Sequence, residues 1–338
     1  MPVNEKWLNT EEEEETLESN LEICDPHHHL WQHPDSTYLT EELLKDTKTG
    51  HNVTSTVFVE CMSEYYRDST KALAPVGETE FIDRLATANT ENNTHTSIAK
   101  AIVGFADLLL GDSVEQVFDA HLEASPNRFK GIRHASGWDP SDQIRNSHTN
   151  PMRFLYLDKT FQKGFAKLLD YGFTFDAWLY HPQHEDLLKL AKSFPNQIIV
   201  LDHVGGPLGI GPYRAQRHCV FESWKKTMNE LAECENVIVK LGGLSMATTG
   251  FGWHKKDKPP NSSELAKATA PYFNFCIERF GTKRCMFESN FPVDKVSCSY
   301  NVLWNSFKKI TLSFSEEEKR DLFHDVAVRT YGLKDSLT

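Results

Sequence analysis

Two histidines separated by a single residue, His27 and His29, follow the first apolar run of the chain. Alternate side chains of an extended segment share one face, so we expect His27 and His29 to lie together. The same alternation places Asp25 on their face and turns His28 away. Two imidazoles on one face can bind one metal ion or polarise one substrate oxygen. Histidines at a strand end can also satisfy backbone carbonyls, so the pair alone leaves both roles open.

A third histidine, His203, closes another apolar run and precedes small residues that leave room for a ligand. Histidines from two strand ends favour one shared site over separate structural roles. Glu60 ends a further apolar run, where burying a carboxylate is costly unless it has a partner. We therefore predict a metal site of His27, His29 and Glu60, because two histidines, a glutamate and an open position form a catalytic zinc arrangement. A helix cap or a salt bridge is the competing role of Glu60.

Side chains beyond two other apolar runs suit substrate binding. The guanidinium fork of Arg133 fits a substrate carboxylate, or equally a neighbouring carboxylate of the protein. Trp178, Tyr180 and His181 follow the next apolar run and are expected to line the site, although a tryptophan there can also pack in the core. Lys240 stands inside an apolar run, so we expect it to pair with a buried carboxylate or to line the pocket.

The elements that must position these residues are short apolar runs alternating with longer amphipathic segments, a pattern typical of βα units around a parallel sheet. Eight such units predict a single (β/α)8 TIM barrel with extra terminal helices, whose site forms at the carboxyl ends of the strands. A doubly wound sheet usually has a glycine-rich first turn, which this chain lacks. We expect an N-terminal helical extension over residues 1–20, the barrel over 21–335, and loop insertions at 135–153 and 243–262. The predicted strands are 21–25, 55–60, 99–106, 129–134, 173–178, 197–203, 236–242 and 284–289.

Composition narrows the classes of function. The chain has 338 residues and a formal net charge of -12, without a basic run that would bind nucleic acid. No apolar run approaches the roughly 18 residues that span a bilayer. We therefore expect a cytoplasmic protein that acts on a small-molecule substrate and binds neither nucleic acid nor a membrane. Assembly into a homo-oligomer is left open. The run of five glutamates at 11–15 is expected to be the solvated face of a short helix.

Five motifs in order resemble the amidohydrolase-2 family, which includes sugar-acid lactonases, pyrone-dicarboxylate lactonase and decarboxylases. The resemblance covers residues 21 to about 332. The motifs are D-P-H-H-H-L-W at 25–31, G-I-R-H at 131–134, V-L-D-H-V-G-G-P at 200–207, V-K-L-G-G-L at 239–244 and F-E-S-N-F-P-V-D at 287–294.

This resemblance implies roles for the matching residues. His27 and His29 match the histidine pair of the first strand, and His203 matches a histidine that contacts metal or the substrate carbonyl. Arg133 stands where the lactonase relatives hold a substrate carboxylate.

The chain departs from the family at Asn290, where relatives typically have an aspartate that binds metal or deprotonates water. An amide cannot act as a general base. Either a displaced carboxylate takes that role, with Glu60 preferred over Asp294 and Glu288, or Asn290 orients water or substrate.

The resemblance implies a hydrolase, foremost a lactonase that opens a small lactone of a sugar acid or of an aromatic-degradation intermediate. One divalent metal ion, zinc first, is the expected cofactor, and a metal-free route in which histidines stabilise the oxyanion stays open. The alternatives are a metal-dependent decarboxylase of a carboxylated ring substrate and a catalytically inactive binding homologue, which Asn290 suggests.

Overall fold

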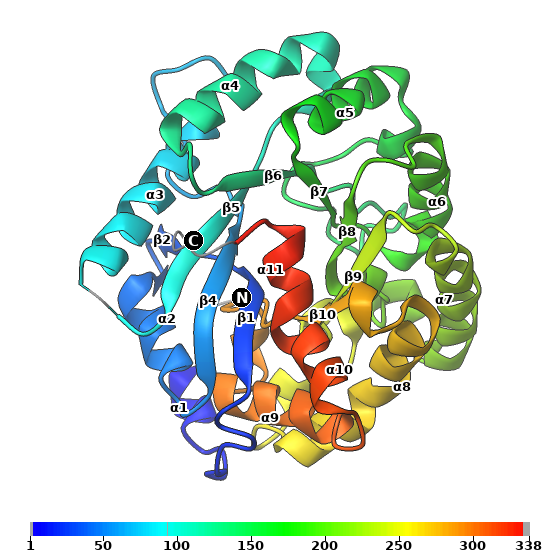
Figure 1. Cartoon of the computed structure of the whole chain (residues 1–338). Coiled ribbons are helices and arrows are strands. Elements are labelled where there is room, and N and C mark those ends of the chain that lie inside the picture. Colours follow the sequence, from blue (N-terminus) through cyan, green and yellow to red (C-terminus); the bar gives the residue numbers. More distant parts are fainter. Residues whose placement is uncertain (1–2, 93, 334–338) are drawn as a thin grey trace.

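The computed structural model describes residues 3–92 and 94–333. Its centre is a parallel sheet in which eight strands follow one another in chain order (Figure 1). The last strand returns to the first through a bridge between His28 and Phe291, so the sheet is a nearly closed barrel. The predicted (β/α)8 barrel is confirmed, and each predicted apolar run overlaps one barrel strand. These strands are β1 (Glu22–His28), β4 (Asn52–Val59), β5 (Ser97–Gly104), β6 (Phe129–Arg133), β7 (Thr174–Ala177), β8 (Ile199–Leu201), β9 (Val237–Leu241) and β10 (Cys285–Phe287).

Amphipathic helices surround the barrel and bury their apolar faces against it (Figure 1). Their ends follow local signals: Asp158 accepts hydrogen bonds from the first turn of α5, and Gly172 ends α5 in the left-handed conformation. A short hairpin, β2 (Trp31–His33) and β3 (Ser36–Tyr38), was not predicted. No helix in the described residues has the length and apolarity to cross a bilayer. The helices are α1 (Glu5–Leu8), α2 (Thr40–Thr47), α3 (Val76–Glu91), α4 (Glu115–Ala124), α5 (Lys159–Tyr171), α6 (His184–Ser193), α7 (Arg217–Ala232), α8 (Ser262–Phe280), α9 (Tyr300–Ile310), α10 (Glu316–Arg320) and α11 (Val326–Thr330).

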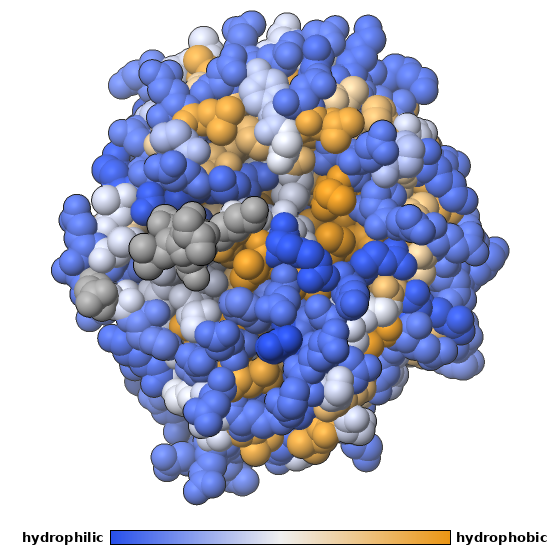
Figure 2. All heavy atoms as spheres, viewed as in Figure 1, coloured by the Kyte–Doolittle hydropathy of each residue, from blue (hydrophilic) through white to orange (hydrophobic). Residues whose placement is uncertain are grey.

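Helix α11 closes one end of the barrel. It crosses the strands in Figure 1, and Val326 and Ala327 pack with inward-facing residues such as Val200, Ile238 and Met286. Those residues precede the candidate site residues along β8, β9 and β10, so α11 lies at the amino-terminal end of the strands. The candidate site therefore lies directly above these apolar residues, which we call the apolar floor. The same view in Figure 2 is mostly hydrophilic with separate hydrophobic patches, in keeping with the acidic composition.

The glutamate run at 11–15 does not form a helix face, so that expectation was wrong. Glu11 accepts a hydrogen bond from the backbone N–H of Ser299 (3.1 Å), the N-cap residue of α9. Glu14 accepts one from the backbone N–H of Ser262 (2.7 Å), the first residue of α8. Carboxylates are favoured there because helix N-termini carry unpaired N–H groups and a positive dipole end. This segment therefore fastens two barrel helices, and the domain boundary at residue 20 stays a prediction.

Candidate active site

A layer of fully buried charges lies directly above the apolar floor. Lys240 Nζ on β9 lies 2.6 Å from Asp176 Oδ2 on β7 and 3.1 Å from Asp202 Oδ1 after β8. Tyr331, just after α11, donates its hydroxyl to Asp176 Oδ2 (2.8 Å). Although burial opposes the charge, Asp176 and Asp202 hold the pKa of Lys240 above its ordinary value. The expected pairing of Lys240 with a buried carboxylate is confirmed.

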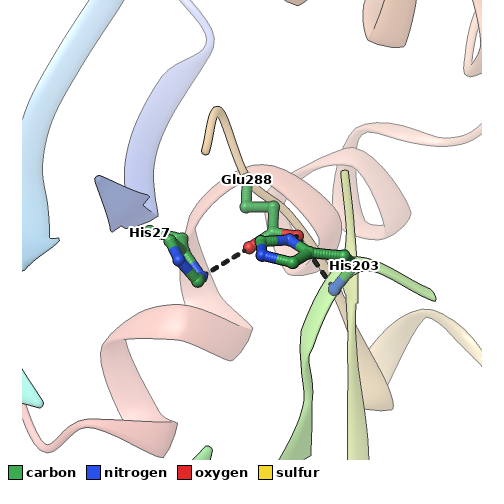
Figure 3. A group of neighbouring side chains, drawn as sticks. All are labelled: His27, His203 and Glu288. Atoms are coloured by element: carbon green, nitrogen blue, oxygen red, sulfur yellow. Dashed lines mark hydrogen bonds and ion pairs between the residues drawn. The ribbon is translucent and has the colours of Figure 1, made fainter. Parts of the chain in front are cut away.

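His27 and His203 converge on Glu288 above this layer (Figure 3). Glu288 Oε2 lies 2.9 Å from His27 Nδ1, and its Oε1 lies 2.6 Å from His203 Nδ1. The two imidazole centroids are 4.6 Å apart. Burial alone would raise the pKa of Glu288, but the two histidines outweigh it and lower that pKa to about 2. Glu288 is therefore a carboxylate at neutral pH.

Local backbone irregularities place these side chains. The register of β1 against β4 shifts between Asp25 and His28, so His27 reaches the barrel interior while Asp25 accepts hydrogen bonds from Ser289 N (2.9 Å) and Tyr300 OH (3.0 Å). The expectation that Asp25 shares the face of His27 was therefore wrong. The ring centroids of His27 and His29 are 5.0 Å apart, as the alternation predicts.

Two positions next to His203 and Glu288 require glycine. A Cβ on Gly243 would lie 2.5 Å from the Cβ of His203, and one on Gly242 would lie 2.3 Å from the Cγ of Glu288. Because no side chain fits there, the two glycines after β9 allow His203 and Glu288 to approach each other.

Arg133 and His148 enclose the carboxylate of Glu60. Arg133 Nε lies 2.7 Å from Glu60 Oε1, and His148 Nε2 lies 2.9 Å from Glu60 Oε2. Arg133 Nη1 is 3.4 Å from His27 Nε2 and 3.5 Å from Asp202 Oδ2. Despite burial, His148 and Arg133 lower the pKa of Glu60 to about 2. The guanidinium of Arg133 is thus occupied by the protein, as in the second of its two expected roles.

Asn290 is hydrogen-bonded to the displaced carboxylate candidate, Asp294. Asn290 Nδ2 donates to Asp294 Oδ1 (3.1 Å), and the backbone N–H of Ser245 donates to Asp294 Oδ2 (3.2 Å). The backbone N–H of Asn290 donates to the carbonyl of His27 (2.9 Å). Burial raises the pKa of Asp294 to about 7. Asn290 therefore connects the first strand to a buried carboxyl group that titrates near neutrality.

The three predicted substrate-binding residues after β7 separate into two groups. Trp178 packs edge-on against His203, with centroids 4.8 Å apart. Tyr180 donates its hydroxyl to the carbonyl of Arg145 (2.5 Å), and His181 Nδ1 accepts from the backbone N–H of Leu208 (3.3 Å). Trp178 therefore borders the site, whereas Tyr180 and His181 hold loop backbone in place.

The donors that fit a metal ion differ from the predicted set. In the described part of the chain, the group that brings three donor atoms within 4.8 Å of one another is His27, His203 and Glu288. Imidazole nitrogens and a carboxylate oxygen are zinc ligands. His29 Nδ1 instead lies 2.7 Å from the carbonyl of Val59, and both oxygens of Glu60 are paired. His29 and Glu60 thus stand outside this group.

The charge of the site also fits a divalent cation. We call the groups joined by these ion pairs the ionic cluster; all of them are buried except His148, which is partly exposed. Its four carboxylates face two cations, a formal excess of two negative charges when the histidines are neutral. Buried charge without compensation is costly, so a divalent ion or protonated histidines would balance the cluster. Its carboxylates are Glu60, Asp176, Asp202 and Glu288, its cations are Arg133 and Lys240, and its histidines are His27, His148 and His203.

Three members of the ionic cluster had no predicted role. Asp202 closes an apolar run and Asp176 interrupts one, and a carboxylate in such a run is the signal that singled out Glu60. Applying that signal to every carboxylate in a strand would have found both. His148 lies in the loop insertion at 135–153, and no sequence pattern linked it to Glu60.

Comparison with known proteins places this architecture in a family. A family model described as amidohydrolase matches residues 24–333. Protein y4mH of Sinorhizobium fredii is 32% identical, over 93% of this chain and 99% of its own length. L-rhamnono-gamma-lactonase of Scheffersomyces stipitis is 23% identical, over 93% of this chain and all of its own length.

A solved structure is similar along nearly the whole chain. It is an amidohydrolase of Burkholderia multivorans with bound zinc, which has a TM-score of 0.71 at 22% identity and covers 92% of this chain and 99% of its own. The barrel, the ordered motifs and the matched family model together identify the chain as a hydrolase that belongs to the amidohydrolase family.

Proposed function

We propose that this protein is a lactonase that opens the lactone of a sugar acid. The observation that carries the proposal is the convergence of His27 and His203 on Glu288, at the end of the barrel where Asp294 is also buried. The similarity to a rhamnonolactonase supports the choice of reaction. Lactone opening needs a base for water and positive charge or hydrogen-bond donors for the carbonyl oxygen, and these residue types supply both.

Asp294 is the preferred base. A carboxyl group with a pKa of about 7 is a better proton acceptor than Glu60, whose pKa is about 2. Asn290 and the Ser245 N–H orient Asp294 by occupying one oxygen each. Asp294 takes a proton from water, whose oxygen bonds to the lactone carbonyl carbon. His203, whose Nδ1 is bonded to Glu288, stabilises with its other ring nitrogen the negative charge that develops on the carbonyl oxygen, and His27 holds Glu288 from the other side.

His27, His203 and Glu288 would hold a divalent ion if one binds. Such an ion would supply Lewis-acid polarisation of the carbonyl and a bound water of lower pKa. Lys240 and Arg133 lie beside His27 and would balance the carboxylates below and around it. We therefore expect purified protein to contain about one zinc per chain.

The charges favour a neutral lactone over a carboxylated substrate. The guanidinium of Arg133 is bonded to Glu60 and is not open to a substrate carboxylate. A sugar-acid lactone carries no charge until it opens, whereas pyrone dicarboxylate and the ring acids of decarboxylases are anionic. This comparison makes the decarboxylase the less favoured alternative.

A lactone screen tests the proposal. Neutral sugar-acid γ- and δ-lactones and pyrone dicarboxylate are each incubated with the enzyme, and proton release is followed with an indicator. We expect turnover of at least one neutral lactone, and its loss in Glu288→Gln and His203→Asn. Metal content is measured on the same preparations. Absence of turnover on every lactone would overturn the proposal; carbon dioxide release from a ring acid would favour the decarboxylase, and binding without turnover the inactive homologue.

A further inference from the structure

One histidine of the ionic cluster has no place in the mechanism described so far. His148 lies in the loop between β6 and α5, and its Nε2 is 2.9 Å from Glu60 Oε2. Its side chain is 26% exposed, whereas Glu60 is fully buried. Because Arg133 already compensates the charge of Glu60, balancing that charge does not by itself require the histidine.

The loop holds the ring of His148 in place on both sides. The backbone N–H of Ser147 donates to the carbonyl of Gly137 (2.7 Å), and the hydroxyl of Thr149 donates to the carbonyl of Ala135 (2.6 Å). These bonds fasten the residues next to His148 to the beginning of the same loop. The imidazole is therefore presented to Glu60 by an ordered backbone.

The arrangement resembles that of a catalytic imidazole oriented by a carboxylate. A carboxylate bonded to one ring nitrogen fixes the ring and stabilises the imidazolium, which leaves the other nitrogen to exchange a proton with substrate. Glu60 occupies Nε2, and Arg133 fixes Glu60 from the opposite oxygen. The second nitrogen of His148, Nδ1, has no hydrogen-bond partner among the described residues, and the 26% exposed side chain allows its proton to be replaced from water.

We propose that His148 is the general acid of lactone opening, oriented by Glu60. This inference rests on the proposed lactonase function. Water, deprotonated by Asp294, forms a bond to the carbonyl carbon, and the bond between that carbon and the ring oxygen breaks. The ring oxygen leaves with the electron pair and takes a proton from His148 Nδ1. Asp294 releases its proton, His148 regains one from solvent and the new carboxylic acid ionises, so the products are a hydroxy acid anion and one proton.

Other titratable groups near His148 do not provide this proton. Glu60 and Arg133 are bonded to each other, and the pKa of Glu60 is about 2. His134, from the end of β6, is electrostatically coupled to His148, but burial lowers the pKa of His134 to about 4 and its Nδ1 accepts from the backbone N–H of Leu108. His134 is therefore neutral and already bonded at neutral pH.

The test is His148→Gln, whose amide can still donate to Glu60 but cannot transfer a proton. For a lactone that the wild type opens, we expect kcat to fall by about 100-fold with little change in KM. The alkaline limb of the kcat–pH profile, where the acid is lost as pH rises, should disappear. His254→Gln, in the loop after β9 and outside the ionic cluster, is the matched control and should retain kcat.

A purely structural histidine gives a different result. If His148 only fastens the loop to Glu60, His148→Gln should keep kcat within about threefold and retain the alkaline limb, and either outcome overturns the inference. Thermal unfolding of both variants checks that the fold is intact, and His148→Ala with added imidazole provides a second measurement, because restored kcat requires proton transfer. A wild type that opens no lactone ends the proposed function and this inference together, whereas an active wild type with an equally active His148→Gln ends this inference alone.

Discussion

Asp294 and Glu60 are both buried carboxyl groups near the same barrel end, yet their surroundings separate their pKa values. Burial dominates at Asp294 and raises its pKa to about 7, whereas His148 and Arg133 lower that of Glu60 to about 2. A pair of carboxyl groups separated in this way indicates which one exchanges protons near neutral pH. Glu60 therefore stays ionised and binds Arg133 and His148 as ion-pair partners, whereas Asp294 gains and loses a proton near neutral pH.

Replacing Asp294 by Asn tests that division. We expect kcat to fall by about 100-fold or more because the amide cannot accept the proton of water. In the wild type, the acid limb of the kcat/KM profile should rise with pH and bend near 7, since the ionised carboxylate is the active form. Asp139→Asn is the control, because Asp139 is buried in the loop after β6 but bonds Tyr213 and not the ionic cluster. Equal losses in both variants would contradict the assignment.

Lys240 allows a prediction about stability. Lys240→Met would leave Asp176 and Asp202 buried without their ammonium partner. Removing one member of a buried ion pair costs about 3–5 kcal/mol, and we expect a loss of that size in the free energy of unfolding by urea. The double variant Lys240→Met, Asp176→Asn should lose less than the sum of the two single variants. Strict additivity would show that the pair is not coupled.

Among the elements, the segment at 11–15 offers an internally matched comparison. Glu14 bonds the first residue of α8 and also accepts from Asn305 Nδ2 of α9 (3.2 Å), whereas Glu13 is exposed. Glu14→Ala should therefore destabilise the protein by about 1 kcal/mol, as loss of a helix cap does. Glu13→Ala should change the free energy of unfolding by less than about 0.5 kcal/mol. The two urea unfolding midpoints provide the comparison, and equal midpoints would refute the capping role.

The barrel strands could be predicted from sequence because their apolar runs are local and most end at a polar residue. The contacts between strands could not be predicted in this way. The shift in register after Asp25 is one displaced residue that no alternation pattern reveals, and it decides which side chains of β1 face the interior. Lys240 was recognisable as unusual in an apolar run, but its partners come from β7 and β8, which the pattern does not align. His148 reaches Glu60 through an irregular loop, whose path depends on tertiary contacts.

At the scale of the whole molecule, buried carboxyl groups should make stability depend on pH in both directions. Burial, and then the charge of Glu60, raise the pKa of Glu78 from 4.5 to about 8. The folded state therefore holds this proton more tightly than the unfolded chain, so its contribution is complete below pH 4.5 and is lost as pH rises to about 8. Glu60 and Glu288 have folded pKa values of about 2, so their contribution is complete above pH 4.5 and is lost as pH falls to about 2.

Urea unfolding between pH 3 and 9 measures both slopes. From these groups we expect the free energy of unfolding to decline on either side of about pH 5, with up to about 1.4 kcal/mol per pH unit for each titrating group. Glu78→Gln can still accept the N–H groups of Cys61 and Ser63, and it should flatten the decline toward pH 8. An unchanged slope in that variant would show that another group titrates.

Among the described residues, helix α11 and the apolar side chains packed against it fill the amino-terminal end of the barrel, so the site is approached from the carboxyl end of the strands. We therefore expect the lactone and its product acid to enter and leave at the same end of the barrel. The acid should then be a competitive inhibitor, even if it makes no contact that the lactone lacks.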